Sequence, residues 1–409
     1  MNSKELLFDS VNQKNQKFDL NLFTTTTHNP SYASLTNNFN TINGLKDYCI
    51  PVNTYFPPDS VMNQLYSKIP YAIKYYPSSN DRISECIAHF SDIDTPARII
   101  TGNGSTEIIS WLNSLFIKDS LFVPTPSFGR WIEEPINLGK KLHTIRYCDE
   151  NAQQLTPEKL IEAVIKSGTK NLIICNPNNP TGSIFTRSEL LSIMGKLQHL
   201  DNIVIDESFI DFSSINPPTV KNDVHLFPNS WVIKSLGKNV GLHGLRIGYA
   251  ISNEDNISKL KKHLPYWNVN GISEMLLTLI QHEKIAYNQS RIKVIEDTKY
   301  LENRFKELHF FETFPTNSNF IFTRLDSIID GEELRNRLMQ NKSCFIRNCG
   351  NKMGSTKQYF RIAARKNEDV DFLIVAIKEE VTDILSNVYS NRTYYQSEFN
   401  NAQDTYSIS

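Results

Sequence analysis

The stretch WVIKSLGKNVGLHGLRIGYAI, residues 231–251, decides the fold expected for this chain. Two apolar runs, 231–234 and 247–251, flank a segment that holds three glycines, one lysine and one arginine. Short apolar runs bounded by glycines are typical of buried strands. The stretch therefore predicts a strand, a loop with polar side chains and a second strand.

The same alternation extends on both sides of this stretch. Further candidate strands are residues 97–101, 120–123, 141–146, 171–175 and 202–205. Helical patterns lie between them, for example at residues 106–117, 157–167 and 187–199. Strands that alternate with helices predict an α/β fold with a mostly parallel, seven-stranded sheet covered on both faces. Ligands of such sheets bind beyond the carboxyl ends of the strands.

The pattern changes after about residue 285. A long helical stretch to residue 310 is followed by strand-like runs at 319–323, 344–348 and 358–363 and by helices at 332–340 and from about 368. We expect a small α+β C-terminal domain there. The predicted division is a polar N-terminal arm at 1–45, a large domain at 46–285, the small domain at 286–385 and a polar, disordered tail at 386–409.

Composition excludes several classes of partner. The 409 residues carry 43 Lys+Arg against 44 Asp+Glu, a formal net charge of -1, which favours neither a nucleic acid nor an anionic membrane as partner. No apolar stretch approaches the roughly 20 residues of a membrane span, and the N-terminus has no signal-peptide pattern. The six cysteines are scattered without CxxC spacing, so we expect no metal site and a cytoplasmic enzyme.

Lys238 follows the first apolar run and is the candidate for covalent chemistry. A solvated surface charge is the alternative interpretation. Ser235 and Arg246 lie close to it in the sequence, and a hydroxyl together with a guanidinium suits a phosphate dianion. The segment therefore favours a lysine that forms a Schiff base with a phosphorylated cofactor.

A second phosphate-binding candidate is IITGNGSTEII, residues 99–109. A strand, a glycine-rich turn and the start of a helix present backbone amides to an anion. Glu107 stands where the dinucleotide fingerprint needs its third glycine, which argues against a dinucleotide site.

Two further loops carry polar residues after apolar strands. In CNPNNPTG, residues 175–182, Asn179 can donate a hydrogen bond to a phenolic oxygen, although asparagine and proline also dominate ordinary turns. In NIVIDESFIDF, residues 202–212, Asp206 ends an apolar run, where a carboxylate needs a partner or serves as a helix cap. A protonated pyridine nitrogen would be such a partner.

Together these four segments resemble the class I/II aminotransferases, fold type I of the pyridoxal-phosphate (PLP) enzymes, over roughly residues 50–385. The resemblance implies PLP as cofactor, with Lys238 as Schiff-base lysine and proton shuttle, Asp206 on the pyridine nitrogen and Asn179 on the ring hydroxyl. The phosphate ligands that it implies are Gly104, Ser105, Thr106, Ser235 and Arg246.

The resemblance also assigns residues at the edge of the site. Phe128 is similar to the ring that stacks on the cofactor, with a core aromatic as the alternative. Tyr76 matches a tyrosine that reaches the cofactor phosphate of the neighbouring subunit, which implies a homodimer with shared sites. Arg361, in QYFRIAARKNED, matches the arginine that binds the substrate's anionic group, and Arg347 is a second candidate contact.

Two subgroups resemble the chain most, the histidinol-phosphate aminotransferases and the threonine-phosphate decarboxylases. The segment IRNCGN followed by YFRIA is more similar to the decarboxylases. Phe209 stands where many aminotransferases carry a tyrosine, and phenylalanine also occurs there in the decarboxylase-like subgroup. The His-Gly-Gly motif of that subgroup is absent, and His28-Asn29-Pro30 is the nearest sequence.

Three hypotheses follow. The first is transamination of a small, dianionic or phosphorylated amino acid, placed slightly ahead because it is the majority behaviour of the fold and because of Arg361. The second is decarboxylation of an O-phospho amino acid, based on Phe209 and IRNCGN. The third is a catalytically silent binding protein, which the joint retention of the lysine, aspartate, asparagine and arginine argues against.

Overall fold

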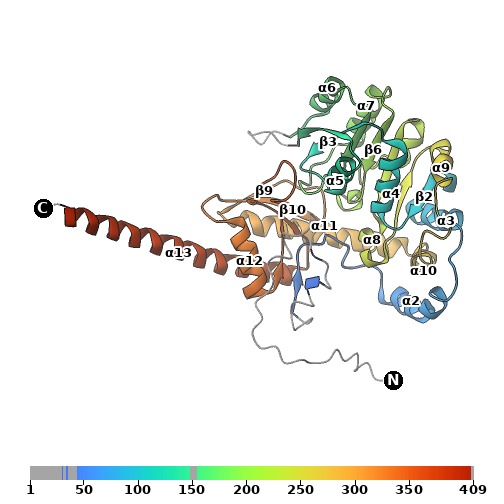
Figure 1. Cartoon of the computed structure of the whole chain (residues 1–409). Helices are drawn as coiled ribbons and strands as arrows, with labels where there is room; N and C mark the ends of the chain where they lie inside the picture. Colours follow the sequence, from blue (N-terminus) through green and yellow to red (C-terminus); the bar gives the residue numbers. More distant parts are fainter. Residues whose placement is uncertain (1–29, 31–33, 36–43, 148–153, 407–409) are drawn as a thin grey trace.

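The computed structural model describes residue 30, residues 34–35, 44–147 and 154–406 (Figure 1). Its largest element is a seven-stranded sheet. In spatial order the strands are β2 (Ile99–Gly102), β8 (Gly248–Ile251), β7 (Ser230–Lys234), β6 (Asn202–Asp206), β5 (Asn171–Cys175), β3 (Ser120–Thr125) and β4 (Lys141–Arg146). All neighbours pair in parallel except at β8, which is antiparallel to both β2 and β7. The predicted fold class is confirmed.

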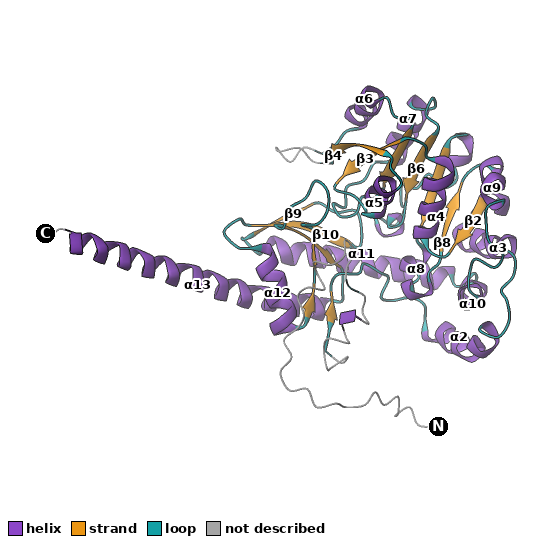
Figure 2. Cartoon of the chain, viewed as in Figure 1, coloured by secondary structure: helices purple, strands orange, loops and turns teal. Residues whose placement is uncertain are grey.

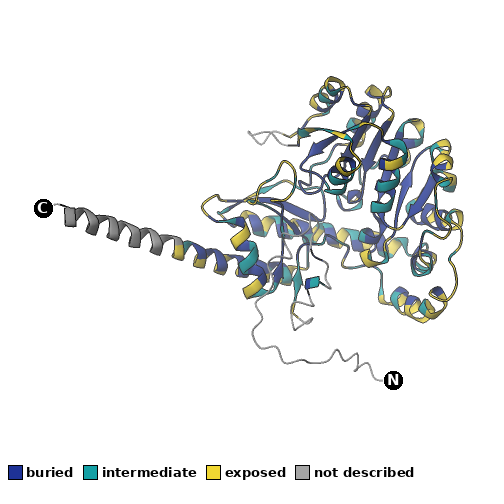
Figure 3. Cartoon of the chain, viewed as in Figure 1, coloured by how far each residue is buried: buried dark blue, intermediate teal, exposed yellow. Residues whose placement is uncertain are grey.

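Helices cover both faces of this sheet (Figure 2). One core packs the sheet against α3 (Asn80–Ser91), α6 (Pro157–Ser167), α7 (Arg187–Lys196) and α10 (Gly271–Ile280), and α2 (Asp59–Ala72) lies on α10. The other core packs it against α4 (Ser105–Trp111), α5 (Arg130–Asn137) and α9 (Glu254–Lys261). Successive residues of a strand point to opposite faces, so Ile203 joins the first core and Val204 the second. The central strands β5, β6 and β7 are buried from end to end, whereas the edge strand β4 is partly exposed (Figure 3).

The C-terminal part, from α11 (Lys284–Lys306) onward, forms a second sheet with its own helices. Its four-stranded antiparallel sheet has the order β12 (Arg347–Asn348), β13 (Tyr359–Ala363), β10 (Phe320–Leu325) and β9 (Phe311–Phe314). Helices α11, α12 (Gly331–Lys342) and the first part of α13 (Asn367–Tyr406) pack on it around a core of their own. In this sheet Arg347 pairs directly with Arg361, so the two side chains share one face.

Residues 46–53 join the two sheets, and we call them the N-terminal strap. The strap begins with β1 (Lys46–Asp47), which pairs in parallel with β11 (Cys344–Phe345). At its other end, the Asn53 amide donates to the carbonyl oxygen of Lys238 at 3.0 Å. In between, the Tyr48 carbonyl oxygen accepts from the Ala363 amide of β13 at 2.7 Å. One short segment therefore contacts both the small sheet and the loop that carries the candidate catalytic lysine.

The C-terminal segment differs from the expectation of a disordered tail at 386–409. The structure continues α13 through Tyr406, and this helix extends away from the rest of the fold (Figure 1). Neither glycine nor proline occurs between Asn367 and Tyr406, so no residue there breaks the helix. The other predicted domain limits stay predictions, and most of the arm lies outside the described residues. No helix in the described part of the chain has the length and apolar character that crossing a bilayer requires.

Candidate active site

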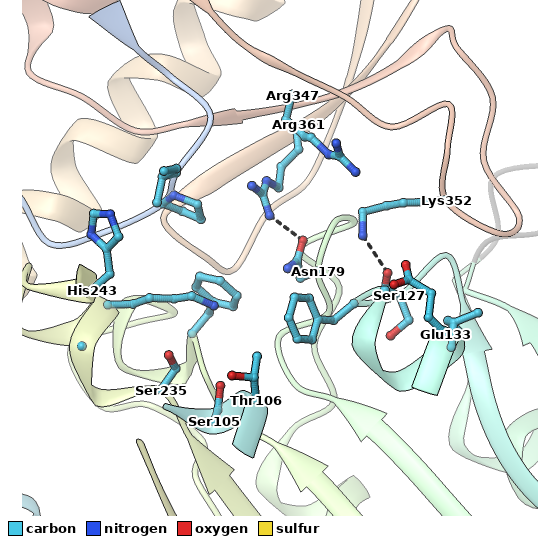
Figure 4. Close-up of a pocket in the computed structure, with 18 of the residues that line it drawn as sticks. Ser105, Thr106, Ser127, Glu133, Asn179, Ser235, His243, Arg347, Lys352 and Arg361 are labelled. Carbon is cyan, nitrogen blue, oxygen red and sulfur yellow. Dashed lines mark hydrogen bonds between the residues drawn. The ribbon is translucent and has the colours of Figure 1, made fainter. Parts of the chain in front are cut away.

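A cavity of about 610 Å³ lies where the carboxyl ends of the large sheet's strands meet the small sheet and the strap. Its floor comes from the large sheet, with Ser105 and Thr106 at the start of α4 and Ser235 after β7 (Figure 4). Its opposite wall comes from the small sheet, with Arg347 and Arg361. The position agrees with the rule that open α/β sheets bind ligands beyond their strand ends.

The residues predicted to hold a phosphate lie together on the floor. Arg246 donates from Nη2 to the Thr106 hydroxyl at 2.9 Å. Its backbone φ is 58°, an unfavourable conformation for a residue with a side chain and one that clusters at functional sites. Gly104 has a φ of 82°, and a Cβ there would lie 2.6 Å from Arg246 Nη2. Glycine at this position thus lets the guanidinium approach the backbone of the turn.

Lys238 lies in α8 (Leu236–Asn239), immediately after β7. Its Nζ is 4.4 Å from the ring centre of Phe209 and 5.6 Å from that of Phe128. Burial is the largest cause that lowers the pKa of Lys238 to about 8; Arg361 and Arg246 also act to lower it, and Asp206 acts to raise it. A lysine with a pKa near neutrality supplies a neutral amine that can act as a nucleophile.

Asp206 ends β6 and is 5% exposed. One carboxylate oxygen accepts a hydrogen bond from the Trp131 indole at 2.9 Å. The other accepts from the Ser208 hydroxyl at 2.6 Å and from the Ser208 amide at 3.1 Å. These donors fix the carboxylate in place, because a buried charge without partners would be costly.

Asn179 and Arg361 meet across the cavity. Arg361 Nη1 donates to Asn179 Oδ1 at 2.7 Å, and Nη2 donates to the carbonyl oxygen of Cys49 in the strap at 2.6 Å. The Nε atom of this buried guanidinium has no hydrogen-bond partner among the described residues. A buried donor without a partner is destabilising, so the site favours an additional acceptor.

The wall carries a third cation, Lys352, in the loop between β12 and β13. Its ammonium donates to the carbonyl oxygen of Ser127 at 2.9 Å, and the Arg347 guanidinium donates to Asn351 Oδ1 at 2.7 Å (Figure 4). Burial first, and then the two arginines, lower the pKa of Lys352 to about 7. Glu133 is the one carboxylate among the described residues that line the cavity.

Most of the predicted site residues are brought together. Those that line the cavity are Ser105, Thr106, Phe128, Asn179, Ser235, Lys238, Arg246, Arg347 and Arg361. Gly104 lies beside Arg246, and Asp206 lies behind the lining, in contact with Trp131. Tyr76 is elsewhere: it is 77% exposed and stacks on Trp267 with ring centres 4.2 Å apart. The roles given to these residues stay predictions.

Sequence reasoning missed several lining residues. These are Ser127, Glu133, His243 and Lys352, and Trp131 was missed behind them. Lys352 was within reach of sequence reasoning, since it stands five residues after Arg347 in the same short segment. Pro30 also lines the cavity, whereas His28 and Asn29 lie outside the described residues. Across the described chain, no cluster of three or more His, Cys, Asp and Glu side chains could hold a metal ion.

The chemistry of these residues fits PLP. The close approach of Arg246 to the Gly104 turn gives a cationic cradle for a phosphate, and Lys238 offers an amine at the same end of the sheet. Asp206 is a fixed carboxylate, which suits a pyridinium nitrogen.

Comparisons with known proteins agree with this fit. The family model "Aminotransferase class I and II" matches residues 47–377. The L-serine phosphate decarboxylase of Campylobacter jejuni is 28% identical over 369 residues, covering 86% of this chain and 92% of that protein. The histidinol-phosphate aminotransferase of Caldanaerobacter subterraneus subsp. tengcongensis is 26% identical over 331 residues, covering 79% and 89%.

A solved structure supports the fold. It is a decarboxylase from Sulfurospirillum multivorans, with a TM-score of 0.79 and 24% identity over 87% of this chain and 93% of that one. The family match spans the cavity floor, the wall and the candidate lysine. The chain belongs to the class I and II aminotransferase family, whose aminotransferases and decarboxylases use pyridoxal 5'-phosphate.

Proposed function

We propose that this enzyme decarboxylates a small amino acid that carries a phosphate on its side chain. The observation that carries the proposal is the cationic wall of the cavity, where Arg347 and Arg361 are direct cross-strand partners on one face of the small sheet. A single α-carboxylate needs one guanidinium. Two arginines and a lysine against one lining carboxylate favour a substrate with more negative charge.

The chain's own residues would divide the work as follows. Ser105, Thr106, Ser235 and Arg246 hold the cofactor phosphate, and Asp206 holds the ring nitrogen. Bound PLP withdraws electrons from the bond that breaks at the substrate's α-carbon. Arg361 and Arg347 orient the substrate, and this orientation selects the bond that breaks. Lys238 would deliver the proton to the substrate's α-carbon after CO2 has left.

Decarboxylation is favoured over transamination by two observations. Relatives named L-serine phosphate decarboxylase are similar over most of their length, at 28% and 25% identity. The ring of Phe209 lies over Lys238, where a tyrosine would add a hydroxyl donor. Transamination is the second candidate, and it draws support from the similarity to histidinol-phosphate aminotransferases over 79% of the chain.

The proposal includes a homodimer with shared active sites. Its support is a group of exposed aromatic side chains around Tyr76, including Tyr75 and Tyr266, together with the stacked Trp267. A group of exposed aromatic side chains is typical of an interaction surface. Light scattering on the purified enzyme would give the mass, and a Tyr76→Phe variant that loses cofactor affinity in a dimer would support the shared site.

A single-turnover experiment tests the reaction. The purified enzyme, loaded with PLP, is mixed separately with O-phospho-L-serine, O-phospho-L-threonine, histidinol phosphate and L-aspartate, without an oxo acid. We expect CO2 and a phosphorylated amine from one of the O-phospho amino acids. A carbonyl product without CO2 would instead establish transamination and would replace the proposal.

A further inference from the structure

We propose that Lys352 sets substrate specificity by binding, together with Arg347, the second anionic group of the substrate. The inference rests on the proposed function for the identity of that group, a phosphate. It adds a specificity-determining residue to a site in which Arg361 and Arg347 are the predicted anion contacts.

The position of Lys352 is the first argument. The side chain reaches from the loop between β12 and β13 across the cavity to the large domain, where it meets the Ser127 carbonyl oxygen (Figure 4). Ser127 directly precedes Phe128, the ring predicted to stack on the cofactor. The ammonium therefore lies beside the place where a substrate would project its side chain, on the same wall as Arg347.

The partner of Lys352 is the second argument. An ammonium has three N–H donors, and the bond to Ser127 uses one of them on a neutral carbonyl oxygen. A neutral acceptor compensates a desolvated positive charge poorly. A phosphate offers several charged oxygens, and such bonds are roughly twice as strong as neutral ones.

The charge around Lys352 is the third argument. Arg347 and Arg361 both act to lower its pKa, and Cys349 and Cys175, which face it from the loop and from β5, act to raise it. Without a ligand, three cations share one wall and repel one another. A dianion between Lys352 and Arg347 would remove that repulsion, whereas a lone α-carboxylate on Arg361 would leave most of it.

The alternative role for Lys352 is to hold the two domains together, because Lys352 lies in one domain and its acceptor Ser127 lies in the other. If Lys352 is only a structural contact, its replacement would lower the free energy of unfolding and would affect all substrates equally. A specificity role would affect doubly anionic substrates selectively. The ratio between substrates separates the two roles.

The test uses three variants of the PLP-loaded enzyme. Lys352→Met keeps a long unbranched side chain and removes the charge, Lys352→Arg keeps a cation, and Lys357→Met is the matched control. Lys357 lies in the same loop but is exposed and pairs with Asp330, away from the cavity. For each variant we would measure the calorimetric Kd and the kcat/KM for O-phospho-L-serine, L-aspartate and L-serine.

We expect Lys352→Met to weaken binding of O-phospho-L-serine by about 10- to 100-fold, the range for a hydrogen bond between charged groups. Binding of L-serine should change by less than about threefold, Lys352→Arg should recover most of the loss, and Lys357→Met should behave as wild type. Equal losses for all three ligands, or no loss, would overturn the role of Lys352.

The same data keep the two proposals apart. If wild type releases CO2 from O-phospho-L-serine and Lys352→Met binds it normally, the inference about Lys352 fails and the proposed function stands. If wild type instead transaminates L-aspartate and Lys352→Met selectively loses that ligand, the proposed function fails and Lys352 remains the contact for the second anion. If wild type does not prefer doubly anionic ligands, both fail.

Discussion

The floor and the wall of the cavity are built in opposite ways. The floor carries one phosphate cradle and one fixed carboxylate: Arg246 bonds Thr106, and the buried Asp206 has donors on both oxygens. The wall is a row of cations from one small sheet and its loop, facing a single lining carboxylate. The floor therefore suits one fixed cofactor, whereas the wall has binding capacity left for a variable, highly charged substrate.

The comparison explains why family membership leaves the reaction open. Relatives with different activities, a decarboxylase and an aminotransferase, match the chain at nearly the same identity, 28% and 26%. Residues on the floor serve any reaction that PLP supports. In the proposed function, the wall decides which group of the substrate is held and hence which bond is broken. Experiments that treat the two surfaces separately test this division.

Lys238→Ala should have the largest effect, because it removes both the covalent link to the cofactor and the proton donor. We expect turnover to fall by at least about 10⁴-fold for every substrate. Absorbance of the lysine-bound cofactor should vanish while the far-UV circular dichroism stays that of wild type. A variant that kept normal turnover would refute the assignment of the floor.

Asp206→Asn should come next, with about a 100-fold loss of turnover, because a neutral amide cannot hold the ring nitrogen protonated. The volume is nearly unchanged, but the amide oxygen can accept from only one side, Trp131 or Ser208, because these donors bond different carboxylate oxygens. The loss should be the same for phosphorylated and unphosphorylated substrates. A substrate-dependent loss would contradict the separation of floor and wall.

The affinity for the substrate's phosphate group should depend on pH through the protonation of Lys352. Its pKa is lowered to about 7 with Arg347, Arg361, Cys349 and Cys175 around it, so the ammonium is present below pH 7 and is lost above it. Affinity for O-phospho-L-serine should therefore fall above pH 7, by at most about tenfold per pH unit.

In the Lys352→Arg variant this decline should be absent up to pH 9, because arginine keeps its proton. Calorimetric Kd values at pH 6.5, 7.5 and 8.5 check it, with L-serine as the reference ligand. An identical decline in both proteins would show that another group is responsible.

Phe209→Tyr should have the smallest effect. Phe209 is buried, with its ring edge-on to Phe320 at 5.3 Å between centres and under the Lys238 ammonium. A hydroxyl there adds one hydrogen-bond donor near the cofactor ring, and we expect less than about a tenfold change in total turnover. The ratio of CO2 to carbonyl product should shift toward transamination. A constant ratio would show that this position does not tune the reaction.

Sequence patterns predicted the large sheet well because most of its strands are short apolar runs buried on both faces. The predicted strands 141–146 and 171–175 have the limits of β4 and β5, and the helix at 157–167 has those of α6. The patterns did not identify α2, whose Pro70 interrupts the helical signal.

The candidate site divides in the same manner. The floor residues follow strands and glycine-rich turns, which can be recognised in the sequence as apolar runs followed by glycines. Lys352 lies in an irregular loop, and its contact with Ser127 joins residues 225 positions apart. The position of Lys352 near Arg347 could be read from the sequence, but periodicity carries no information on its contact with Ser127, so only the structure shows that contact.

The N-terminal strap has a consequence for protein engineering. Its carbonyl oxygens at Cys49 and Ile50 accept hydrogen bonds from Arg361 and Arg365, and Asn53 bonds the backbone of Lys238. A truncated chain that starts after Asn53 would keep all strands of the large and the small sheet. It would lose the carbonyl oxygen that orients Arg361, the arginine predicted to bind the substrate. Affinity tags, fusion partners and cleavage sites therefore belong ahead of Lys46.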